Sequence, residues 1–442
     1  MFEPGYEYKP LGSAVSGHIG GGTPPRQVAS YWRGTIPWAS VKDFPENSGT
    51  IADTEEHVSL AGLNASTSNL IPADTPLVCT RMAVGRAAMP SVPMAINQDV
   101  KAIFPAEGVS PSYLLKVLQF IQPKAEAQAV GSTVKGIRIQ DYLNISTPLA
   151  PTEAQPAIAE VLDNLETVIS NTEVIVAKLR SVKQGLLHDL LTRGIDANGE
   201  LRPPQTEAPH LYKESPLGGI PKQWEVKQIT ELLADVDPAM RSGPFGSALL
   251  KQELVEVGLP LLGIDNVHTE RFVADYCRFV TPKKFIELAR YAVRPADLMI
   301  TIMGTVGRCC LVPEDIGQAL SSKHTWTITL NQDSYSPYLA MLQINYSPWV
   351  LQHFARDQQG GTMAAIRSET LRSTILPTPP RDEQRLMEER LREISKKIDL
   401  EVDAFTKMQA EKSGLMGDLL TGRVPITPLL AKQEEHEAEG VA

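Results

Sequence analysis

A ten-residue stretch that occurs twice constrains this chain more than any other feature. Residues 183–192 are KQGLLHDLLT, and 229 positions later residues 412–421 are KSGLMGDLLT, so seven of the ten positions are identical. The same offset, without a gap, aligns Gln155 with Gln384. A duplication over this length predicts two copies of one structural unit. We therefore expect the target of the protein to have two parts as well.

Each copy of the repeated stretch ends a long segment with a heptad pattern. Apolar residues recur in steps of four and three, which is typical of a coiled-coil seam. The predicted seam residues are Ile158, Leu162, Leu165, Ile169, Leu179, Leu186 and Leu190 in the first segment, and Leu391, Ile394, Ile398, Phe405, Leu415 and Leu419 in the second. Polar residues interrupt the two seams at the same places, Thr172 and Lys183 in one and Glu401 and Lys412 in the other.

Two helices with matching seams favour one another as partners. Each would be about 60 Å long at 1.5 Å per residue and needs a partner of similar length. Because a globular segment separates them in the chain, the sequence predicts antiparallel pairing and a pseudo-two-fold repeat. The alternative is two unrelated amphipathic helices, each packed on its own domain.

The remaining segments complete an α+β fold class. Gly, Pro and short apolar runs between the helices indicate strands and turns. We predict a globular domain at 1–150, a spacer helix at 151–195, a linker at 196–216, a second globular domain at 217–380, a second spacer helix at 381–423, and an acidic disordered tail at 424–442.

The net charge of −10 is unusual for a protein that binds nucleic acid, so its distribution matters. Residues 1–150 carry 11 basic and 12 acidic side chains, and residues 217–380 carry 15 and 16. The acidic excess therefore lies mainly in the helical segments and the tail. Local basic patches on the two globular domains remain compatible with these numbers.

Several classes of protein are disfavoured by missing motifs. No apolar run has the roughly 20 residues of a membrane span, and the first residues do not resemble a secretory signal. The four cysteines form no CxxC pair, and the histidines have no metal-ligand spacing. We find no phosphate-binding loop and no methyltransferase motif. We expect a cytoplasmic protein that catalyses nothing and binds no cofactor or metal.

At this point the chain resembles a known family, the specificity (S) subunits of type I restriction-modification enzymes. The resemblance is carried by residues 178–196 (KLRSVKQGLLHDLLTRGID), by GGGTP at 20–24 with IPW at 36–38, and by GPFGS at 243–247 with LPLL at 259–262. It covers residues 1 to about 425. The family has two target-recognition domains, separated and followed by helical spacers.

The resemblance implies that this chain chooses a DNA sequence for partner subunits. Each globular domain would recognise one part of a bipartite, asymmetric site in double-stranded DNA, and the spacers would set the gap. The implied partners are two modification subunits, which use S-adenosylmethionine, and restriction subunits that translocate DNA with ATP and Mg²⁺. An alternative from another class is a scaffold with two protein- or glycan-binding modules on a coiled coil.

DNA recognition requires donors and acceptors that reach base edges, and cations on phosphates. In the first domain the candidates are Thr23, Arg26, Arg33, Lys42, Arg81, Arg86, Lys135 and Arg138. In the second they are Arg241, Ser247, Lys251, Asn266, His268, Arg308, Lys323, His324 and Arg367. We place Lys42 and Asn266 at roughly corresponding positions, and we expect Trp38 to be a core residue.

Overall fold

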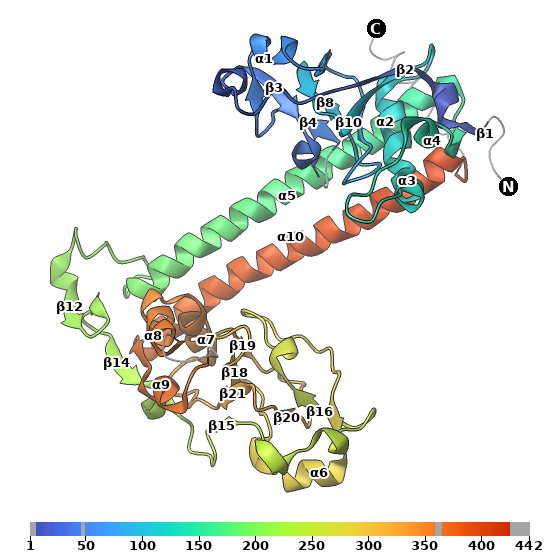
Figure 1. The fold of residues 1–442 in the computed structure, drawn as a ribbon. Helices are drawn as coiled ribbons and strands as arrows, with labels where there is room; N and C mark the ends of the chain where they lie inside the picture. Colours follow the sequence, from blue (N-terminus) through green and yellow to red (C-terminus); the bar gives the residue numbers. More distant parts are fainter. Residues whose placement is uncertain (1–5, 46–48, 359–364, 425–442) are drawn as a thin grey trace, which may run out of the picture. The chain divides into compact units, whose positions relative to one another are not determined.

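The computed structural model describes residues 6–45, 49–358 and 365–424. It divides into two compact units, Met1–Ala177 with Asp399–Ala442, and Lys178–Ile398. Both long helices, α5 (Gln155–Thr192, 38 residues) and α10 (Arg381–Thr421, 41 residues), are shared between the units (Figure 1). The boundaries of the compact units therefore differ from those of the domains predicted along the chain.

The described part of the first unit contains short strands, four short helices and segments of α5 and α10. Its strands are β1 (Glu7–Pro10), β2 (Val15–Gly20), β3 (Ile36–Ala39), β4 (Thr50–Ile51), β5 (His57–Val58), β6 (Leu70–Ile71), β7 (Leu77–Cys79), β8 (Ala87–Pro90), β9 (Met94–Ile96), β10 (Val100–Pro105) and β11 (Ser146–Leu149). Its helices are α1 (Leu60–Asn64), α2 (Pro111–Phe120), α3 (Gln122–Gln128) and α4 (Ile139–Leu143). The strand orders are β2-β10-β7-β8-β4, β5-β3-β9-β6 and β1-β11.

The second unit contains a similar set of elements. Its strands are β12 (Tyr212–Ser215), β13 (Gly218–Pro221), β14 (Glu225–Gln228), β15 (Met240–Ser242), β16 (Leu259–Leu262), β17 (Phe279–Val280), β18 (Leu298–Thr301), β19 (Cys309–Leu311), β20 (Leu320–Ser321), β21 (Thr325–Ile328) and β22 (Ile375–Thr378). Its helices are α6 (Pro282–Glu287), α7 (Pro337–Tyr346), α8 (Pro348–Gln358) and α9 (Ser368–Ser373). The strand orders are β15-β21-β18-β19, β17-β16-β20, β14-β22 and β12-β13.

The strand pairings of the two units correspond one to one over most of the sheets. β10 pairs antiparallel with β2 and β7, as β21 does with β15 and β18. β3 pairs antiparallel with β5 and parallel with β9, as β16 does with β17 and β20. β1 pairs with β11, and β14 with β22. The duplication therefore extends from the helices to the topology of the globular parts.

The glutamine at the start of each long helix explains one of the sequence matches. Gln155 Oε1 accepts from the backbone N of Ser110 at 3.3 Å, and its Nε2 donates to the Ala150 carbonyl at 3.1 Å. Gln384 makes the equivalent bonds, with the backbone N of Ser336 at 2.8 Å and the Pro379 carbonyl at 2.8 Å. Both glutamines are buried, so these polar groups need their partners. Each glutamine ties a long helix to the start of a short one.

Each unit contains an antiparallel pair of helix segments in its core. In the first unit, Ile158 and Leu162 of α5 join a core cluster with Met416, Leu419 and Leu420 of α10. Since the start of one helix meets the end of the other, the segments run antiparallel. Burial of each such side chain contributes about 1.5–3 kcal/mol.

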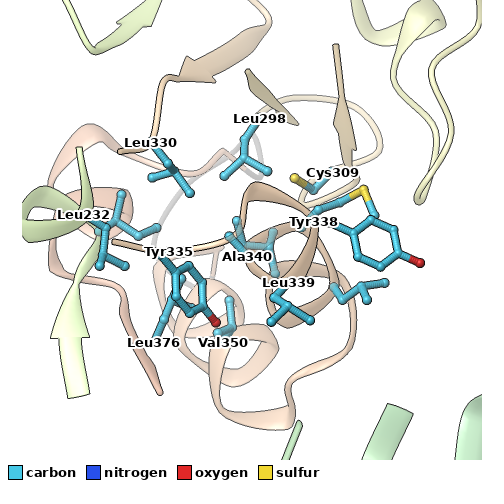
Figure 2. Close-up of a cluster of buried hydrophobic side chains, with 14 of the residues drawn as sticks. Leu232, Leu298, Cys309, Leu330, Tyr335, Tyr338, Leu339, Ala340, Val350 and Leu376 are labelled. Carbon is cyan, nitrogen blue, oxygen red and sulfur yellow. The ribbon is translucent and has the colours of Figure 1, made fainter. Parts of the chain in front are cut away.

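The second unit has the matching arrangement of its own helix segments. Leu187, Leu190 and Leu191 of α5 join a cluster with Met387 and Leu391 of α10. Figure 2 shows the centre of this cluster, where Leu339 and Ala340 of α7 lie among Leu298, Cys309 and other strand residues. The predicted seam residues are buried (Ile158, Leu162, Ile169, Leu190, Leu391, Ile398, Leu419) or half-buried (Leu165, Leu179, Leu186, Ile394, Phe405, Leu415).

The two lysines that interrupt the seams have different partners. Lys412 Nζ lies 2.8 Å from Glu166 of α5, and the same carboxylate also pairs with the fully buried Lys116 of α2 at 2.9 Å. Lys183 lies 2.7 Å from Glu270, which also accepts a hydrogen bond from the Tyr346 hydroxyl. Equivalent seam positions therefore make different ion pairs in the two units.

The segment predicted as a linker, 196–216, is a structured part of the second unit. Arg202 is 6% exposed and pairs with Glu383 in the first turn of α10, through Nη2 at 2.9 Å. Glu383 also accepts from the Trp224 indole at 3.0 Å and from the backbone N of Ile195 at 2.9 Å. Composition alone indicated a linker because it carries no information about the carboxylate that Arg202 meets.

Of the predicted tail, 424–442, only Val424 belongs to the described residues. Within the described ranges, no helix is both long and apolar enough to cross a membrane.

Candidate nucleic-acid interface

Three loops of the first unit bring several predicted residues together. Gln98, between β9 and β10, accepts a hydrogen bond from the Thr23 hydroxyl at 2.5 Å. The neighbouring Asp99 pairs with Arg81 at 3.2 Å. Arg81 in turn forms a β-bridge with Gly136, which follows Lys135. Thr23, Arg81 and Lys135 are all exposed and lie around one loop, although they are distant in sequence.

The glycine-rich entry next to Thr23 has a structural role. Gly22 donates from its backbone N to the Ile96 carbonyl at 3.1 Å. A Cβ on Gly21 would lie 1.8 Å from that oxygen, so only glycine fits there. This close approach fixes the loop that carries Thr23. Trp38 is 2% exposed and donates to the Gly22 carbonyl at 3.1 Å, so it is a core residue as predicted.

Arg26 and Lys42 lie near the edge strand β5 and have acidic neighbours. Arg26 stacks on Trp32, with its guanidinium carbon 3.7 Å from the ring centroid, and pairs with Glu56. The hydrogen bond from Arg26 lowers the pKa of Glu56, and the carboxylate raises the pKa of Arg26. Lys42 lies 3.9 Å from Glu55. Both cations remain exposed.

The corresponding loop of the second unit carries different side chains. The backbone N of Ile302 donates to the His324 carbonyl, and the backbone N of Thr80 donates to the Asp99 carbonyl. Because these two hydrogen bonds are equivalent, Lys323 corresponds to Gln98 and His324 corresponds to Asp99. These two residues line a cavity of about 390 Å³. Its lining also includes Lys251 and Arg278 with Leu249, Leu250, Leu254 and Leu261.

The cavity is locally positive. Burial, together with the charges of Lys323 and Arg278, lowers the pKa of His324. An anion placed here would offset this repulsion. The structure thus brings together the predicted residues Lys251, Lys323 and His324 at a site suited to a phosphate.

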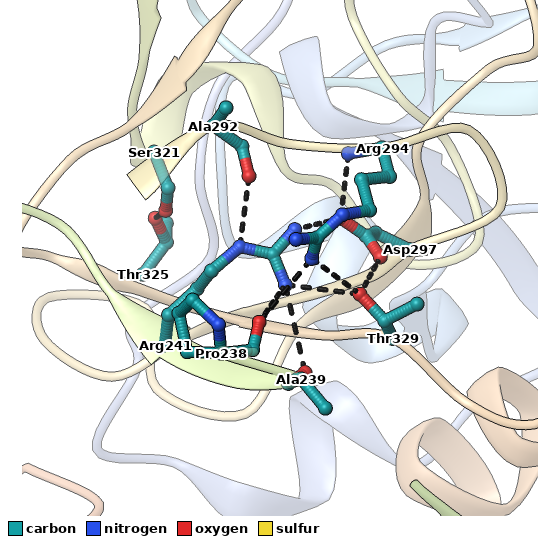
Figure 3. Close-up of polar contacts among 9 residues, drawn as sticks. All are labelled: Pro238, Ala239, Arg241, Ala292, Arg294, Asp297, Ser321, Thr325 and Thr329. Carbon is teal, nitrogen blue, oxygen red and sulfur yellow. Dashed lines mark hydrogen bonds and ion pairs between the residues drawn. The ribbon is translucent and has the colours of Figure 1, made fainter. Parts of the chain in front are cut away.

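The prediction that Arg241 contacts DNA is wrong. Its side chain is 2% exposed and pairs with Asp297, which is fully buried (Figure 3). Arg241 also donates to the Thr329 hydroxyl at 2.9 Å and to the Ala292 carbonyl at 2.8 Å. Burial disfavours both charges, lowering the pKa of Arg241 and raising that of Asp297. Arg241 therefore supports the fold of the second unit.

The prediction for Asn266 is also wrong. Asn266 is 2% exposed, and its amide donates to the carbonyls of Val273 and Asp275 at 2.9 and 3.0 Å. Its Oδ1 accepts from the backbone N of Gly263 at 2.9 Å, as Asp43 accepts from that of Ser40 in the first unit. Asn266 thus corresponds to Asp43, and the counterpart of Lys42 is Asp265, one residue earlier.

The other predicted residues occupy varied positions. Arg33, Arg138, Ser247 and Arg367 are exposed, whereas Arg86, His268 and Arg308 are half-buried. Arg86 donates to the Phe44 carbonyl at 3.4 Å, which favours support of the fold. These residues do not converge on one of the two loop clusters described above.

Sequence reasoning missed Glu56, Asp265 and Arg278. Glu56 and Arg278 each directly precede the short strand that pairs with β3 or β16, so they are equivalent. An alignment of the two halves around residues 56–58 and 278–280 is the signal that would have found them. Within the described ranges, no group of three or more His, Cys, Asp or Glu side chains is arranged to hold a metal.

Comparison with known proteins finds relatives of one class. Residues 6–180 match the family model of the type I restriction modification DNA specificity domain. The MjaVIII type I restriction enzyme specificity subunit of Methanocaldococcus jannaschii is 22% identical over 72% of this chain and 71% of its own length. The EcoR124I/EcoR124II specificity subunit of Escherichia coli is 28% identical over 37% of this chain and 42% of its own length.

A solved structure shares the fold. The S subunit of a type I restriction-modification system from M. genitalium has a TM-score of 0.57 and 14% identity, covering 94% of this chain and 96% of its own. The fold is thus that of a duplicated α+β protein with two long helices. Residues 6–180 are therefore similar to the DNA specificity domain of type I restriction-modification systems, and the relatives named above are specificity subunits of such systems.

Proposed function

We propose that this chain is the DNA sequence-recognition subunit of a type I restriction-modification complex, and that each unit recognises one part of a bipartite, asymmetric target. One observation carries the proposal. The units share a strand topology, yet the same loop presents Gln98 and Asp99 in one and Lys323 and His324 in the other. A common frame that exposes Gln98 in one unit and Lys323 in the other, beside the buried Asp99 and the half-buried His324, suits two different base sequences.

The partners follow from the same proposal. Two modification subunits, with S-adenosylmethionine, would methylate the chosen site, and restriction subunits with ATP and Mg²⁺ would translocate and cleave DNA in the cytoplasm. This chain would catalyse neither reaction. The relatives found are specificity subunits, so they give no support to the alternative of a scaffold for proteins or glycans.

Methylome sequencing tests the function. Genomic DNA from cells with and without this gene is compared for methylated motifs. We expect a bipartite motif that disappears with the gene. An unchanged set of motifs, in a cell without a second system of the same specificity, would overturn the proposal.

Exchange of the first globular domain tests modularity. Residues 1–150 are replaced by the corresponding domain of another specificity subunit, and the motif is mapped again. We expect one part of the motif to change and the other to persist. A change in both parts would refute independent recognition by the two halves.

Insertion of one heptad into both α5 and α10 tests the role of the helices. Seven added residues lengthen a helix by about 10 Å, or roughly three base pairs of DNA. We expect a longer gap between two unaltered parts. Altered parts would show that the helices do more than set the spacing.

A further inference from the structure

Arg26 is held in a fixed orientation on the surface of the first unit. Its two terminal nitrogens donate to the two carboxylate oxygens of Glu56, Nη2 to Oε2 at 2.9 Å. Its planar group stacks on Trp32, which makes an edge-to-face contact with the buried Trp38 at 5.0 Å between centroids. Because 53% of the side chain is nevertheless exposed, the guanidinium is both fixed and accessible.

We call this arrangement, an arginine fixed by a neighbouring carboxylate, a clamp. The clamp leaves some of the N–H donors of Arg26 available. A guanidinium has five N–H donors, and Glu56 accepts two of them. The other three donors have no partner among the described residues. A guanine presents O6 and N7 in the major groove, and an arginine reads them with two parallel N–H donors. A planar group whose orientation is already set loses less conformational freedom on making that pair.

Arg278 is a second arginine held by a carboxylate, in the second unit. Its Nη2 donates to Asp265, whose other oxygen accepts from the Cys277 thiol at 3.0 Å. Burial raises the pKa of Asp265, but the bonds from Cys277 and Arg278 outweigh it and lower that pKa. Arg278 Nε is buried and has no hydrogen-bond partner in the part of the chain that the structure describes.

The positions of the two clamps are related by the duplication, with the charges exchanged. Arg278 occupies the position of Glu56, and Asp265 occupies that of Lys42. Each unit therefore has an arginine clamped at the edge of the strand pair β3–β5 or β16–β17, although the two arginines come from different places in the sequence. Both units therefore have a clamp at this edge, but the arginine reaches it from a different segment of the chain in each unit.

We propose that Arg26 and Arg278 are specificity-determining residues, each reading one guanine in its own part of the DNA target. This inference rests on the proposed function and adds the residue and the base. Glu56 and Asp265 are positioning residues that hold the guanidinium planes. The competing explanation is two ion pairs that only stabilise the surface, and exposed pairs of this kind contribute little.

The test uses the full chain co-expressed with its modification subunits. The methylated motif of the host genome is mapped for the unaltered complex and for Arg26→Ala, Arg26→Lys, Arg278→Ala and Arg278→Lys. Lys124→Ala and Lys283→Ala, both at exposed cations that are not recognition candidates, are the matched controls. Binding is then measured with duplexes that carry the mapped motif or a change at one base pair.

We expect a G·C pair in each part of the motif. Arg26→Ala should make that pair degenerate in one part only and weaken binding of the motif duplex by roughly 10- to 100-fold. Arg278→Ala should do the same in the other part. The lysine variants should not restore discrimination, because an ammonium lacks the paired donors. The control variants should weaken binding to all duplexes alike and leave the motif unchanged.

Three outcomes are decisive. A part without a G·C pair, or an arginine variant that methylates the unaltered motif with unaltered stringency, overturns the inference for that arginine. If an alanine variant fails to assemble, the lysine variant, which retains the charge, decides by the same criterion. If the unaltered complex yields no motif that depends on this chain, the proposed function itself fails, whatever the arginines do.

Discussion

The two units have the same framework and different exposed side chains. Gln155 and Gln384 make the same pair of buried hydrogen bonds, and β10 and β21 have the same neighbours. At the equivalent loop, however, Asp99 pairs with Arg81, whereas His324 lines a cationic cavity. The comparison teaches that sequence identity between the halves marks support of the fold, and that difference marks the surface available for recognition.

Arg241→Met should have the largest effect and should expose a difference between the frameworks. It leaves Asp297 buried without its partner, and removal of one member of a buried ion pair costs about 3–5 kcal/mol. We expect the second unit to unfold at lower urea concentration while hydrogen exchange in the first unit is unaffected. Equal loss of protection in both units would show that the units unfold together.

Gln155→Ala and Gln384→Ala test whether the frameworks are equivalent. Each substitution leaves a backbone N–H and a carbonyl without their partner, at about 1–3 kcal/mol, and Gln384→Ala also removes the donor to the Ser334 carbonyl. We expect similar losses of stability, each local to its own unit by hydrogen exchange. A large loss in one unit and none in the other would contradict equivalence at this position.

Lys183→Met and Lys412→Met should differ, although they occupy equivalent seam positions. Glu166 keeps Lys116 when Lys412 is removed, whereas among the described residues Glu270 keeps only the Tyr346 hydroxyl when Lys183 is removed. We expect Lys183→Met to cost about 1–3 kcal/mol and Lys412→Met less than about 1 kcal/mol. Urea unfolding, monitored by hydrogen exchange, measures the loss of stability of each variant. A larger loss for Lys412→Met than for Lys183→Met would contradict this explanation.

His324 should give the second unit a modest pH dependence that the first unit lacks. Its pKa is lowered, first by burial and then by Lys323 and Arg278, so it is mostly neutral at pH 7.5. A DNA phosphate would favour protonation, and binding should strengthen by a few fold between about pH 7.5 and pH 6. Fluorescence anisotropy with the motif duplex should show this rise in the unaltered complex but not in His324→Gln.

The free protein should respond to pH in the opposite sense at the same residue. A histidine whose pKa is lowered on folding stabilises the protein above the ordinary histidine pKa, and that stability is lost as the pH falls through the lowered value. Stronger binding at lower pH should therefore accompany slightly lower stability without DNA. Parallel changes in both quantities would show that His324 is not the responsible group.

The helices and the framework could be predicted from sequence because their signal is local and repeated. Heptad spacing and the shared offset at Gln155 and Gln384 predicted α5, α10 and the relation between the halves. The exposure of single polar residues was not predictable in this way. Arg241 lies on a strand whose partners are set by long-range pairing, and only that pairing places Asp297 beside it.

Alignment of the two halves of the sequence was also a poor predictor of the residues proposed to recognise DNA. A displacement of one residue equated Lys42 with Asn266 instead of Asp265, and so assigned a helix-capping side chain to the surface. Arg278 escaped notice because its counterpart, Glu56, has the opposite charge. Recognition residues differ between the halves by their nature, so similarity between the halves is a poor guide to them.

One contact at the end of α10 has a counterpart at the end of α5. The Tyr6 hydroxyl donates to the Leu419 carbonyl at 2.6 Å, 413 residues away in the chain, and its ring lies beside Gly422. Trp224 lies in the same way beside Gly194, which follows α5. Both glycines have a positive φ, so each long helix ends in a left-handed residue covered by an aromatic ring of its own unit. In the first unit that ring comes from the opposite end of the described chain, so loss of Tyr6 should loosen the last turn of α10 although the two are distant in sequence.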